Sequence, residues 1–215
     1  HNEEYIKEKN LKLGDHILIE RSGDVIPQIV KSMPELRTGE EQDIVFPKQC
    51  PVCAQTLFKT EEEAVWRCVN IGCKAQVVER IIHFVSKDAM DIRGLGESNV
   101  RKFFEMGLIT DIPGIYAFDV QLLNNKEGFG AKSIDNLKEA IEASKKQPLH
   151  RFVYALGIRY VGETTAKTIA QHIESIFDLE QMNEEALMEL EDVGVKVAKS
   201  IYEFFQNADN IKMLK

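Results

Sequence analysis

The four cysteines of this chain fall within 24 residues, and their spacing constrains the fold more sharply than any other feature. They form two close pairs, Cys50 with Cys53 and Cys68 with Cys73, and fourteen residues separate the pairs. Two such pairs on either side of a hairpin-length insert are typical of a tetrahedral zinc site. Four thiolates leave zinc no open position for water or substrate, so we expect one structural Zn²⁺ ion per chain.

Two disulfides, or a redox-active Cys-x-x-Cys pair, are alternative interpretations of the same cysteines. Disulfides need an oxidising compartment, and the sequence contains no apolar signal segment. A redox pair at Cys50 and Cys53 would leave the second pair of cysteines unexplained. Because the chain does not begin with Met, we expect it to be a piece of a longer protein.

The composition limits the choice of partners. No run of residues is long and apolar enough to span a bilayer, so we expect no membrane contact. The formal net charge is -8, which argues against the broad basic surface of many nucleic-acid-binding proteins. This acidity is compatible with DNA contacts made by backbone amides and a few placed cations.

Residues 1–46 have the pattern of strands. Their β-branched residues and turn residues predict a hairpin with strands at 16–21 and 25–30 and a turn at 22–24. Pro27 cannot donate a hydrogen bond to a neighbouring strand, so it marks an edge or a bulge. Two or three strands cannot bury a core alone, and we therefore expect the tail of a small β-barrel.

The rest of the chain is predicted to be a zinc unit followed by helices. Residues 47–78 form the zinc unit, in which Phe58 and Trp66 are expected to supply a small apolar core. From Val77 onward apolar residues recur at three- and four-residue steps, which predicts helices throughout 79–215. The predicted fold is therefore multi-domain and mainly α: a partial β-barrel, a zinc finger and an all-helical domain.

The helical part contains a repeat marked by four glycines that lie 34, 32 and 32 residues apart: Gly96, Gly130, Gly162 and Gly194. An apolar residue precedes each glycine, and apolar residues follow it at four and seven positions. A fixed period of this length indicates a repeated supersecondary unit. The offsets predict a helix, a glycine turn, and a second helix that begins at the glycine and buries its +4 and +7 face.

The turn has the form Gly-apolar-Gly in the first two copies, Gly94-Leu95-Gly96 and Gly128-Phe129-Gly130. Glycine permits a positive φ and a close approach by another backbone. The first amides of the following helix lack internal partners, and such a helix N-terminus attracts phosphate. This is the helix-hairpin-helix pattern, so we expect contact with the DNA backbone without base reading. Simple helix starts in a helical repeat are the alternative.

The four copies are not equivalent. Tyr160 replaces the first glycine of the third turn, and Asp192 replaces that of the fourth. Because Asp192 places a negative charge where phosphate would bind, we expect the fourth copy to be mainly structural. The residues predicted to bind DNA are the glycines of the first three copies and the cations beside them: Arg93, Gly94, Gly96, Gly128, Gly130, Lys132, Arg159 and Gly162.

Together these residues resemble the C-terminal part of the bacterial NAD-dependent DNA ligases, over essentially the whole chain. Residues 1–6, 13–15 and 21–27 are similar to the family's oligonucleotide-binding (OB) barrel. The cysteine unit is similar to its zinc finger, although Lys74 stands where the family more often has proline. Similarity to its helix-hairpin-helix domain lies at residues 90–96, 156–162 and 197–201.

The resemblance adds Arg21, on the barrel, to the predicted DNA-binding residues. It implies a parent enzyme that seals nicks in duplex DNA during replication and repair, using NAD and Mg²⁺, in the bacterial cytoplasm. The family's Lys-x-Asp-Gly adenylation motif does not occur here, so we expect no catalytic residue in this chain and no binding of NAD or Mg²⁺ by it. The adenylation domain and a terminal BRCT domain would lie elsewhere in the same protein.

Two other classes of protein could use the same parts. One is a non-catalytic zinc and helix-hairpin-helix scaffold of a repair or recombination complex. The other is the accessory tail of a nuclease or topoisomerase. The barrel tail at 21–27 favours the ligase, since those alternatives have no reason to carry it.

Overall fold

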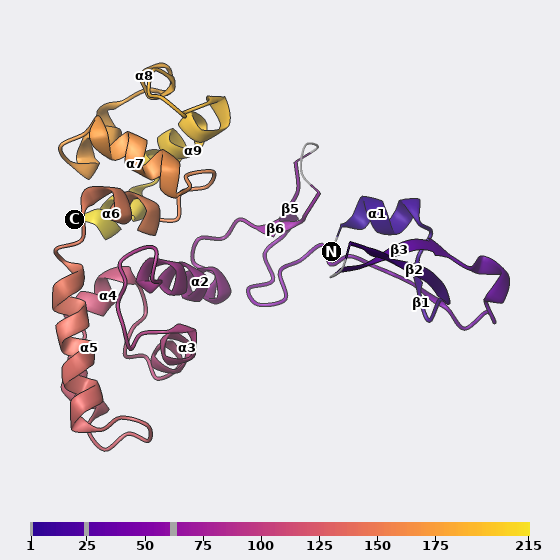
Figure 1. Cartoon of the computed structure of the whole chain (residues 1–215), viewed down its shortest axis with the longest axis horizontal. Coiled ribbons are helices and arrows are strands. Elements are labelled where there is room, and N and C mark those ends of the chain that lie inside the picture. Colours follow the sequence, from indigo (N-terminus) through magenta and orange to yellow (C-terminus); the bar gives the residue numbers. More distant parts are fainter. Residues whose placement is uncertain (1, 24–25, 61–63) are drawn as a thin grey trace. The chain divides into compact units, whose positions relative to one another are not determined.

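The structure is a computed structural model that describes residues 2–23, 26–60 and 64–215. The chain divides into two units, His1–Lys74 and Ala75–Lys215, and each is described by itself (Figure 1). The predicted fold class is confirmed, because helices dominate and the sheets of the described residues are two-stranded and open. None of the described helices combines the length and the apolar content that a membrane span requires.

The first unit begins with helix α1 (Glu3–Glu8), where the sequence predicted only strands. Asn2 caps this helix, since its side-chain oxygen accepts hydrogen bonds from the amides of Glu4 and Tyr5 at 3.1 and 3.2 Å. The prediction was wrong because the helix buries none of its residues and so shows no apolar period. The cap and the two acidic residues of the first turn were the available signal.

The predicted hairpin is present in this unit. Strand β2 (Ile17–Ser22) pairs antiparallel with β3 (Ile26–Ser32). Pro27 lies opposite Arg21 in regular register, and the irregularity falls instead between Leu18 and Ile19. The end of the predicted turn at Asp24 and the start of the predicted second strand at Val25 lie outside the described residues.

The first unit also contains a second small sheet and a buried ion pair. Strand β1 (Lys12–Leu13) pairs with β4 (Gln42–Asp43), and the 3-10 helix η1 (Pro34–Leu36) lies between them in the sequence. Arg37 donates from Nε and Nη2 to the two carboxylate oxygens of Asp15, at 2.6 and 2.7 Å. The Asp15 side chain is only 1% exposed, so this pair supplies the local order that a larger apolar core would otherwise give.

The cysteine region folds as a small hairpin. Strand β5 (Leu57–Phe58) pairs with β6 (Arg67–Cys68), which places Cys68 opposite Leu57. Phe58 is 56% exposed, so the expectation that it fills an apolar core is wrong. It points away because side chains alternate along a strand, and Leu57 with its cross-strand partner Cys68 occupies the inner face.

The second unit consists of four helical hairpins. The first helices of the hairpins are α2 (Lys74–Val85), η2 (Val120–Leu123), α6 (Leu149–Ala155) and α8 (Glu184–Met188). The second helices are α3 (Glu97–Glu105), α5 (Ala131–Ser144), α7 (Glu163–Gln171) and α9 (Val195–Gln206). The remaining helices are α4 (Ile112–Ala117), η3 (Ile176–Gln181) and α10 (Ala208–Leu214).

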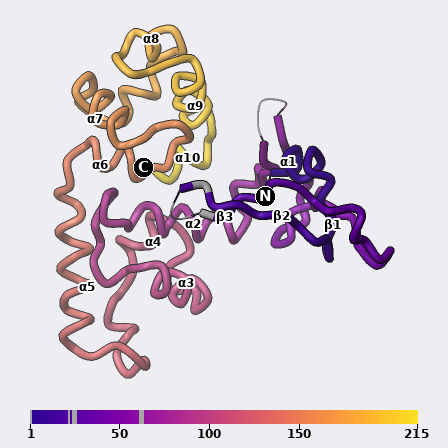
Figure 2. Tube along the Cα trace, turned by 45° about the vertical axis from the view of Figure 1, so that its right-hand side comes forward, coloured from indigo at the N-terminus to yellow at the C-terminus, as the bar shows by residue number. Residues whose placement is uncertain are grey.

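Two hydrophobic clusters fill this helical unit. One is built mainly from the first two hairpins, with Ala155 of α6, and the other from the last two. In both views α7, α8 and α9 form a group apart from α3, α4 and α5 (Figures 1 and 2). The predicted inward face is confirmed, since the +4 and +7 residues of every copy are 2% exposed or less: Val100, Phe103, Ile134, Leu137, Ala166, Ile169, Ala198 and Ile201.

Polar contacts join the two groups of helices. The Nε2 atom of His83 on α2 lies 2.8 Å from the carbonyl oxygen of Tyr154 on α6. Arg151 of α6 donates from Nε to the carbonyl of Ala89 at 2.7 Å. In each of these contacts a side chain of one hairpin meets a backbone carbonyl of the other. The contacts therefore hold the first and third hairpins together.

Candidate functional site

The four cysteine sulfurs converge on one point. All four Sγ atoms lie within 4.8 Å of one another. The Sγ atoms of Cys53 and Cys68 are 3.5 Å apart, and those of Cys50 and Cys73 are 3.9 Å apart. A tetrahedral zinc ion with Zn–S bonds of about 2.3 Å needs sulfurs about 3.8 Å apart. The cysteines are free, and their geometry fits zinc and not two disulfides, whose sulfurs would be about 2.05 Å apart.

Each cysteine pair sits on a tight turn. The carbonyl of Cys50 accepts a hydrogen bond from the Ala54 amide at 2.9 Å, and the Cys50 amide donates to Gln55 at 2.8 Å. In the second turn the Asn70 carbonyl accepts from the Cys73 amide at 3.0 Å. These turns aim both pairs of sulfurs inward, and among the described residues no other His, Cys, Asp or Glu side chains converge in this way.

The thiols of Cys53 and Cys68 have opposed pKa shifts. The amide of Gln55 and then the side chain of Asn70 donate to Cys53 and lower its pKa to about 6. For Cys68 a hydrogen bond from Asn70 lowers the pKa, but burial and the neighbouring thiols outweigh it and raise the pKa to about 12. Several thiolates this close repel one another. A dication at the centre removes that repulsion, because zinc binds cysteine as the thiolate.

The zinc hairpin is attached to helix α1 by Trp66, which was predicted to lie in a local core, and by a lysine. Trp66 donates from Nε1 to the Glu3 carboxylate at 2.7 Å, and Lys48 lies 3.8 Å above the centre of the Trp66 ring. Lys59 forms an ion pair with Glu4 at 3.0 Å. Trp66 is therefore a link between two segments of the first unit, which no local sequence signal indicated.

The four hairpin turns share one backbone form. The residue two positions before the N-cap glycine has a positive φ in every copy: Gly94 at 90°, Gly128 at 87°, Tyr160 at 64° and Asp192 at 60°. A side chain other than that of glycine costs about 1–2 kcal/mol in this region. The third and fourth copies therefore keep the turn of the first two despite the replaced glycine, which means that copy four is not distorted by Asp192.

The N-cap glycines are the second shared feature of the four turns. Their φ values lie between -69° and -96°, which any residue can adopt. A Cβ atom built on any of them would meet no other atom of the described chain within 4 Å. Of the two glycines in the second turn, Gly128 therefore has the positive φ that favours glycine, and a replacement of Gly130 would not strain the backbone.

The helices that follow these glycines lack side-chain caps. Six other described helices are capped by polar side chains that accept hydrogen bonds from the first-turn amides: Asn2, Asp111, Asp119, Ser175, Asn183 and Asn207. Helices α6 and η1 also lack such a cap. The glycine positions thus leave both open space and uncapped amides at four equivalent helix starts.

The predicted cations lie beside their own turns. The Arg93 side chain is 85% exposed, three residues before Gly96. Lys132 is exposed at the second position of α5. The Arg159 guanidinium lies 4.7 Å above the Tyr160 ring. The sequence analysis missed Lys196, which has the place in the fourth copy that Lys132 has in the second.

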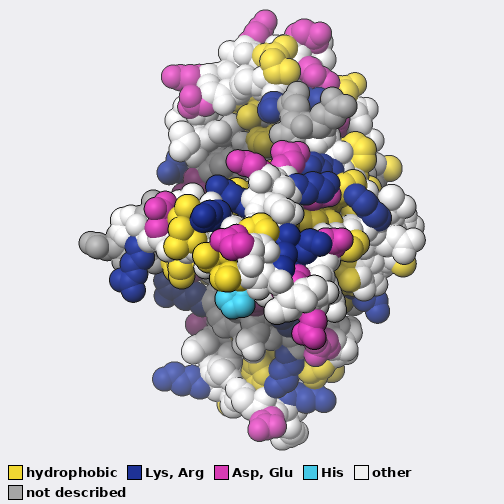
Figure 3. Space-filling view, turned by 90° about the vertical axis from the view of Figure 1, so that its right-hand side faces the viewer, with side chains coloured by type: hydrophobic (Ala, Val, Ile, Leu, Met, Phe, Trp, Pro, Cys, Tyr) yellow, Lys and Arg dark blue, Asp and Glu magenta, His cyan; other side chains and the backbone are white. Residues whose placement is uncertain are grey.

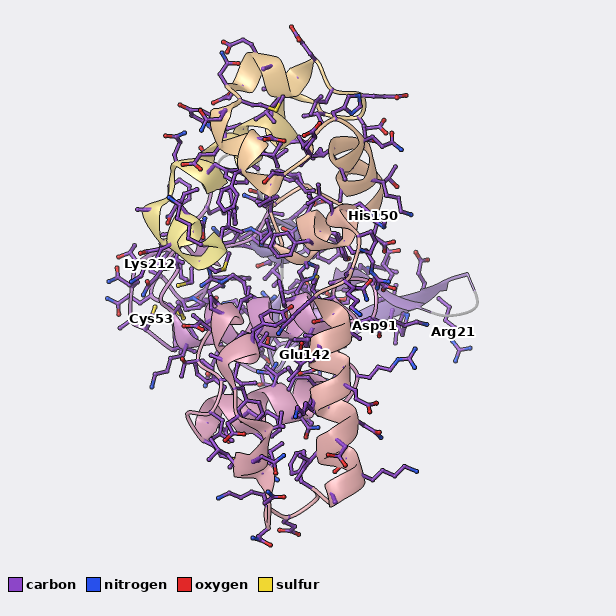
Figure 4. The ribbon with its side chains drawn as sticks, turned by 90° about the vertical axis from the view of Figure 1, so that its left-hand side faces the viewer. Arg21, Cys53, Asp91, Glu142, His150 and Lys212 are labelled. Atoms are coloured by element: carbon purple, nitrogen blue, oxygen red, sulfur yellow. The ribbon has the colours of Figure 1, made fainter. Side chains whose placement is uncertain are left out.

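Arg21 belongs to the other unit, His1–Lys74. It is exposed at the end of the β2–β3 ribbon, where Figure 4 labels it. Cys53, labelled in the same view, belongs to that unit as well. The predicted residues therefore form two sets: the zinc ligands with Arg21, and the hairpin turns.

Fold and site together define a protein in which a four-cysteine zinc finger precedes helix-hairpin-helix repeats. Comparison with known families gives three matches. The NAD-dependent DNA ligase OB-fold domain matches residues 1–41, and the NAD-dependent DNA ligase C4 zinc finger domain matches residues 49–75. The helix-hairpin-helix motif matches residues 151–214.

Individual relatives agree with these matches. The DNA ligase of Persephonella marina is 56% identical over 214 residues, and that of Sulfurihydrogenibium azorense is 54% identical over the same length. The DNA ligase of Aquifex aeolicus is 50% identical. Each alignment covers 100% of this chain and 30% of the relative. The chain belongs to the NAD-dependent DNA ligase family and spans about a third of the length of these relatives.

Proposed function

We propose that this chain is the DNA-gripping part of an NAD-dependent DNA ligase. It binds the sugar-phosphate backbone of nicked duplex DNA without reading the bases, and the remainder of the longer protein seals the nick. The domains would be the end of an OB barrel at 1–46, the zinc finger at 47–78 and the helix-hairpin-helix domain at 79–215. The work would take place on the chromosome in the bacterial cytoplasm.

The empty space at the four N-cap glycines carries this proposal. A Ser or Asp at such a position would cap the helix with its side chain and stabilise it by roughly a few tenths of a kcal/mol relative to glycine. Glycine forgoes this gain at all four turns, although neither φ nor packing within the described chain requires it. A ligand that approaches the backbone closely explains the choice, and phosphate suits the uncapped amides.

The distribution of charge supports a local grip. Lys and Arg side chains are interspersed with Asp and Glu on the face drawn in Figure 3, with no single basic field. The net charge of -8 adds no long-range attraction to DNA. Affinity would therefore come from the turns themselves and from Arg93, Lys132 and Arg159 beside them, and it would fall with salt.

Zinc would be held by Cys50, Cys53, Cys68 and Cys73 and would supply folding energy, because four thiolates leave no coordination site for a reaction. NAD and Mg²⁺ would bind to the adenylation domain of the longer protein. The role of this segment in sealing would be to hold the duplex while that domain acts, and Arg21 would add a contact from the barrel.

The proposal is tested by titrating the chain with nicked, intact and single-stranded DNA of several sequences while salt is varied. We expect weak binding to both duplexes, no sequence preference, and a log affinity that falls linearly with log salt. Incubation with labelled NAD and Mg²⁺ should leave the chain unlabelled, whereas the full-length protein should form an enzyme–AMP adduct. Duplex binding without an adduct in the full-length protein would favour the scaffold alternative, and no duplex binding would refute the proposal.

A further inference from the structure

The two groups of helices share a contact between neighbouring hairpins that the repeat alone did not reveal. Lys102 stands six residues after Gly96, and Thr168 stands six residues after Gly162. Each of them reaches the turn of the next hairpin in its own group. Lys102 donates to the carbonyl of Glu127 at 3.0 Å, and Thr168 lies 3.5 Å from the Asp192 carboxylate.

The Lys102 contact is the more extensive of the two. Its Nζ atom also lies 5.2 Å from the centre of the Phe129 ring, which suits a cation–π interaction. The same ring packs against Phe103, with centroids 5.4 Å apart. The turn between Glu127 and Gly130 is thus held by a half-buried lysine from above and by a fully buried phenylalanine from below.

We infer that Lys102 is a positioning residue for the second DNA-contacting turn. It orients the Glu127 peptide, which directly precedes Gly128, and thereby fixes the direction in which the first amides of α5 point. The ammonium group is engaged with a carbonyl and a ring of its own chain, and in this inference it acts through these two contacts and not as a ligand of phosphate. This inference rests on the proposed function, since the turn matters to DNA only if the hairpins bind it.

The inference makes a distinction that ordinary mutagenesis can measure. A lysine that contacts phosphate releases counterions, so its loss lowers the slope of log affinity against log salt by about 0.9. A lysine that orients the turn contributes to affinity without contributing to this slope. Lys102 precedes this turn in the sequence and Lys132 follows it. Loss of Lys132 should change the slope of log affinity against log salt, whereas loss of Lys102 should not.

The experiment compares Lys102→Met with Lys132→Met and with Lys138→Met, in which an exposed lysine of α5 away from the turn is changed. We expect Lys102→Met to lower duplex affinity about three- to tenfold, the net effect of one typical hydrogen bond, with an unchanged salt slope. Lys132→Met should lower both affinity and slope, and Lys138→Met should leave affinity nearly unchanged. Lys102→Arg, which retains a donor, should restore most of the affinity.

Amide hydrogen exchange of the free protein tests the same contact without DNA. In Lys102→Met the amides of residues 127–133 should exchange faster, while those of α7 and α9 should not change. A salt slope that falls as it does in Lys132→Met, or unchanged affinity together with unchanged exchange, would overturn the inference. If the wild-type chain binds no duplex, the proposed function fails, and the exchange measurement alone decides whether Lys102 holds the turn.

Discussion

Tyr160 and Asp192 occupy the same position in two different hairpins and adopt nearly the same φ, 64° and 60°. In the first two hairpins glycine fills this position. The turn conformation is therefore maintained where the side chain opposes it, which indicates that the surrounding helices impose it. What differs among the copies is the chemistry presented at the turn: no side chain, an aromatic ring stacked on Arg159, or a carboxylate.

A change of Asp192 to Gly tests whether the fourth turn can grip DNA. The turn is already formed, so the group that would repel a phosphate is the Asp192 carboxylate. We expect Asp192→Gly to raise duplex affinity about two- to fivefold at low salt. Relief of the positive φ should raise the free energy of unfolding by up to about 1 kcal/mol.

Asp192→Asn is the matched control for that change, since it removes the charge and keeps a side chain that tolerates the left-handed region. Both variants should bind DNA more tightly than the wild-type protein in the same titration. Unchanged affinity in both would mean that the fourth hairpin is structural only, as the sequence alone suggested.

Removal of one zinc ligand should dismantle the cysteine hairpin. The wild-type protein is expected to carry about one equivalent of zinc by elemental analysis, and Cys68→Ser should retain well below half an equivalent. Trp66 is the only tryptophan of the chain and lies in this hairpin, so its fluorescence should shift as its contacts with Glu3 and Lys48 are lost. Circular dichroism should show that the helices of residues 75–215 remain. Full folding without metal would contradict the zinc assignment.

The ion pair of Asp15 and Arg37 predicts a dependence on acid. Hydrogen bonds from Arg37, followed by the Lys12 amide, lower the pKa of Asp15 to about 2. A carboxylate whose pKa is lower in the folded state stabilises that state fully above its unfolded pKa, about 3.9, and loses the effect as pH falls through 2. Asp15→Asn should therefore melt at a lower temperature than the wild-type protein at neutral pH, and the difference should shrink between about pH 4 and pH 2. A difference independent of pH would exclude this origin.

The sequence predicted the parts of the fold that depend on local pattern. The spacing of Cys50, Cys53, Cys68 and Cys73 predicted convergent sulfurs, and the glycine period predicted which helix faces are buried. Both work because a metal site and an amphipathic helix constrain residues at fixed separations. The hairpin in residues 16–32 followed from β-branched content for the same reason.

The features that sequence reasoning missed depend on partners far apart in the chain. Helix α1 buries nothing of its own, yet Glu3 binds Trp66, 63 residues later. In the sequence Lys102 looks like any other surface lysine, because its partner, the Glu127 carbonyl, lies 25 residues later in the turn of the next hairpin. The positive φ of Asp192 was not predictable either, since tertiary packing overrides the preference of its side chain.

We propose that the N-cap glycines of the four hairpins leave space for the DNA backbone. Gly130→Ser tests it most directly, because serine is a good N-cap that fits the φ of -96° and the empty space around it. Gly107→Ser, at an exposed loop glycine with φ of 69° and no hairpin role, serves as the control for the substitution itself. The measurement pairs a thermal melt with a titration of nicked duplex for each variant.

Gly130→Ser should have opposite effects on the stability of the protein and on its affinity for duplex DNA. The protein should be as stable as the wild-type chain or more stable by roughly a few tenths of a kcal/mol, since the serine side chain caps α5. Duplex affinity should nevertheless fall about tenfold, because the side chain occupies the space and the amides intended for phosphate. Gly107→Ser should lower stability and leave affinity unchanged. A Gly130→Ser protein that is stable and binds nicked duplex as tightly as the wild-type chain would show that Gly130 does not leave space for the DNA backbone.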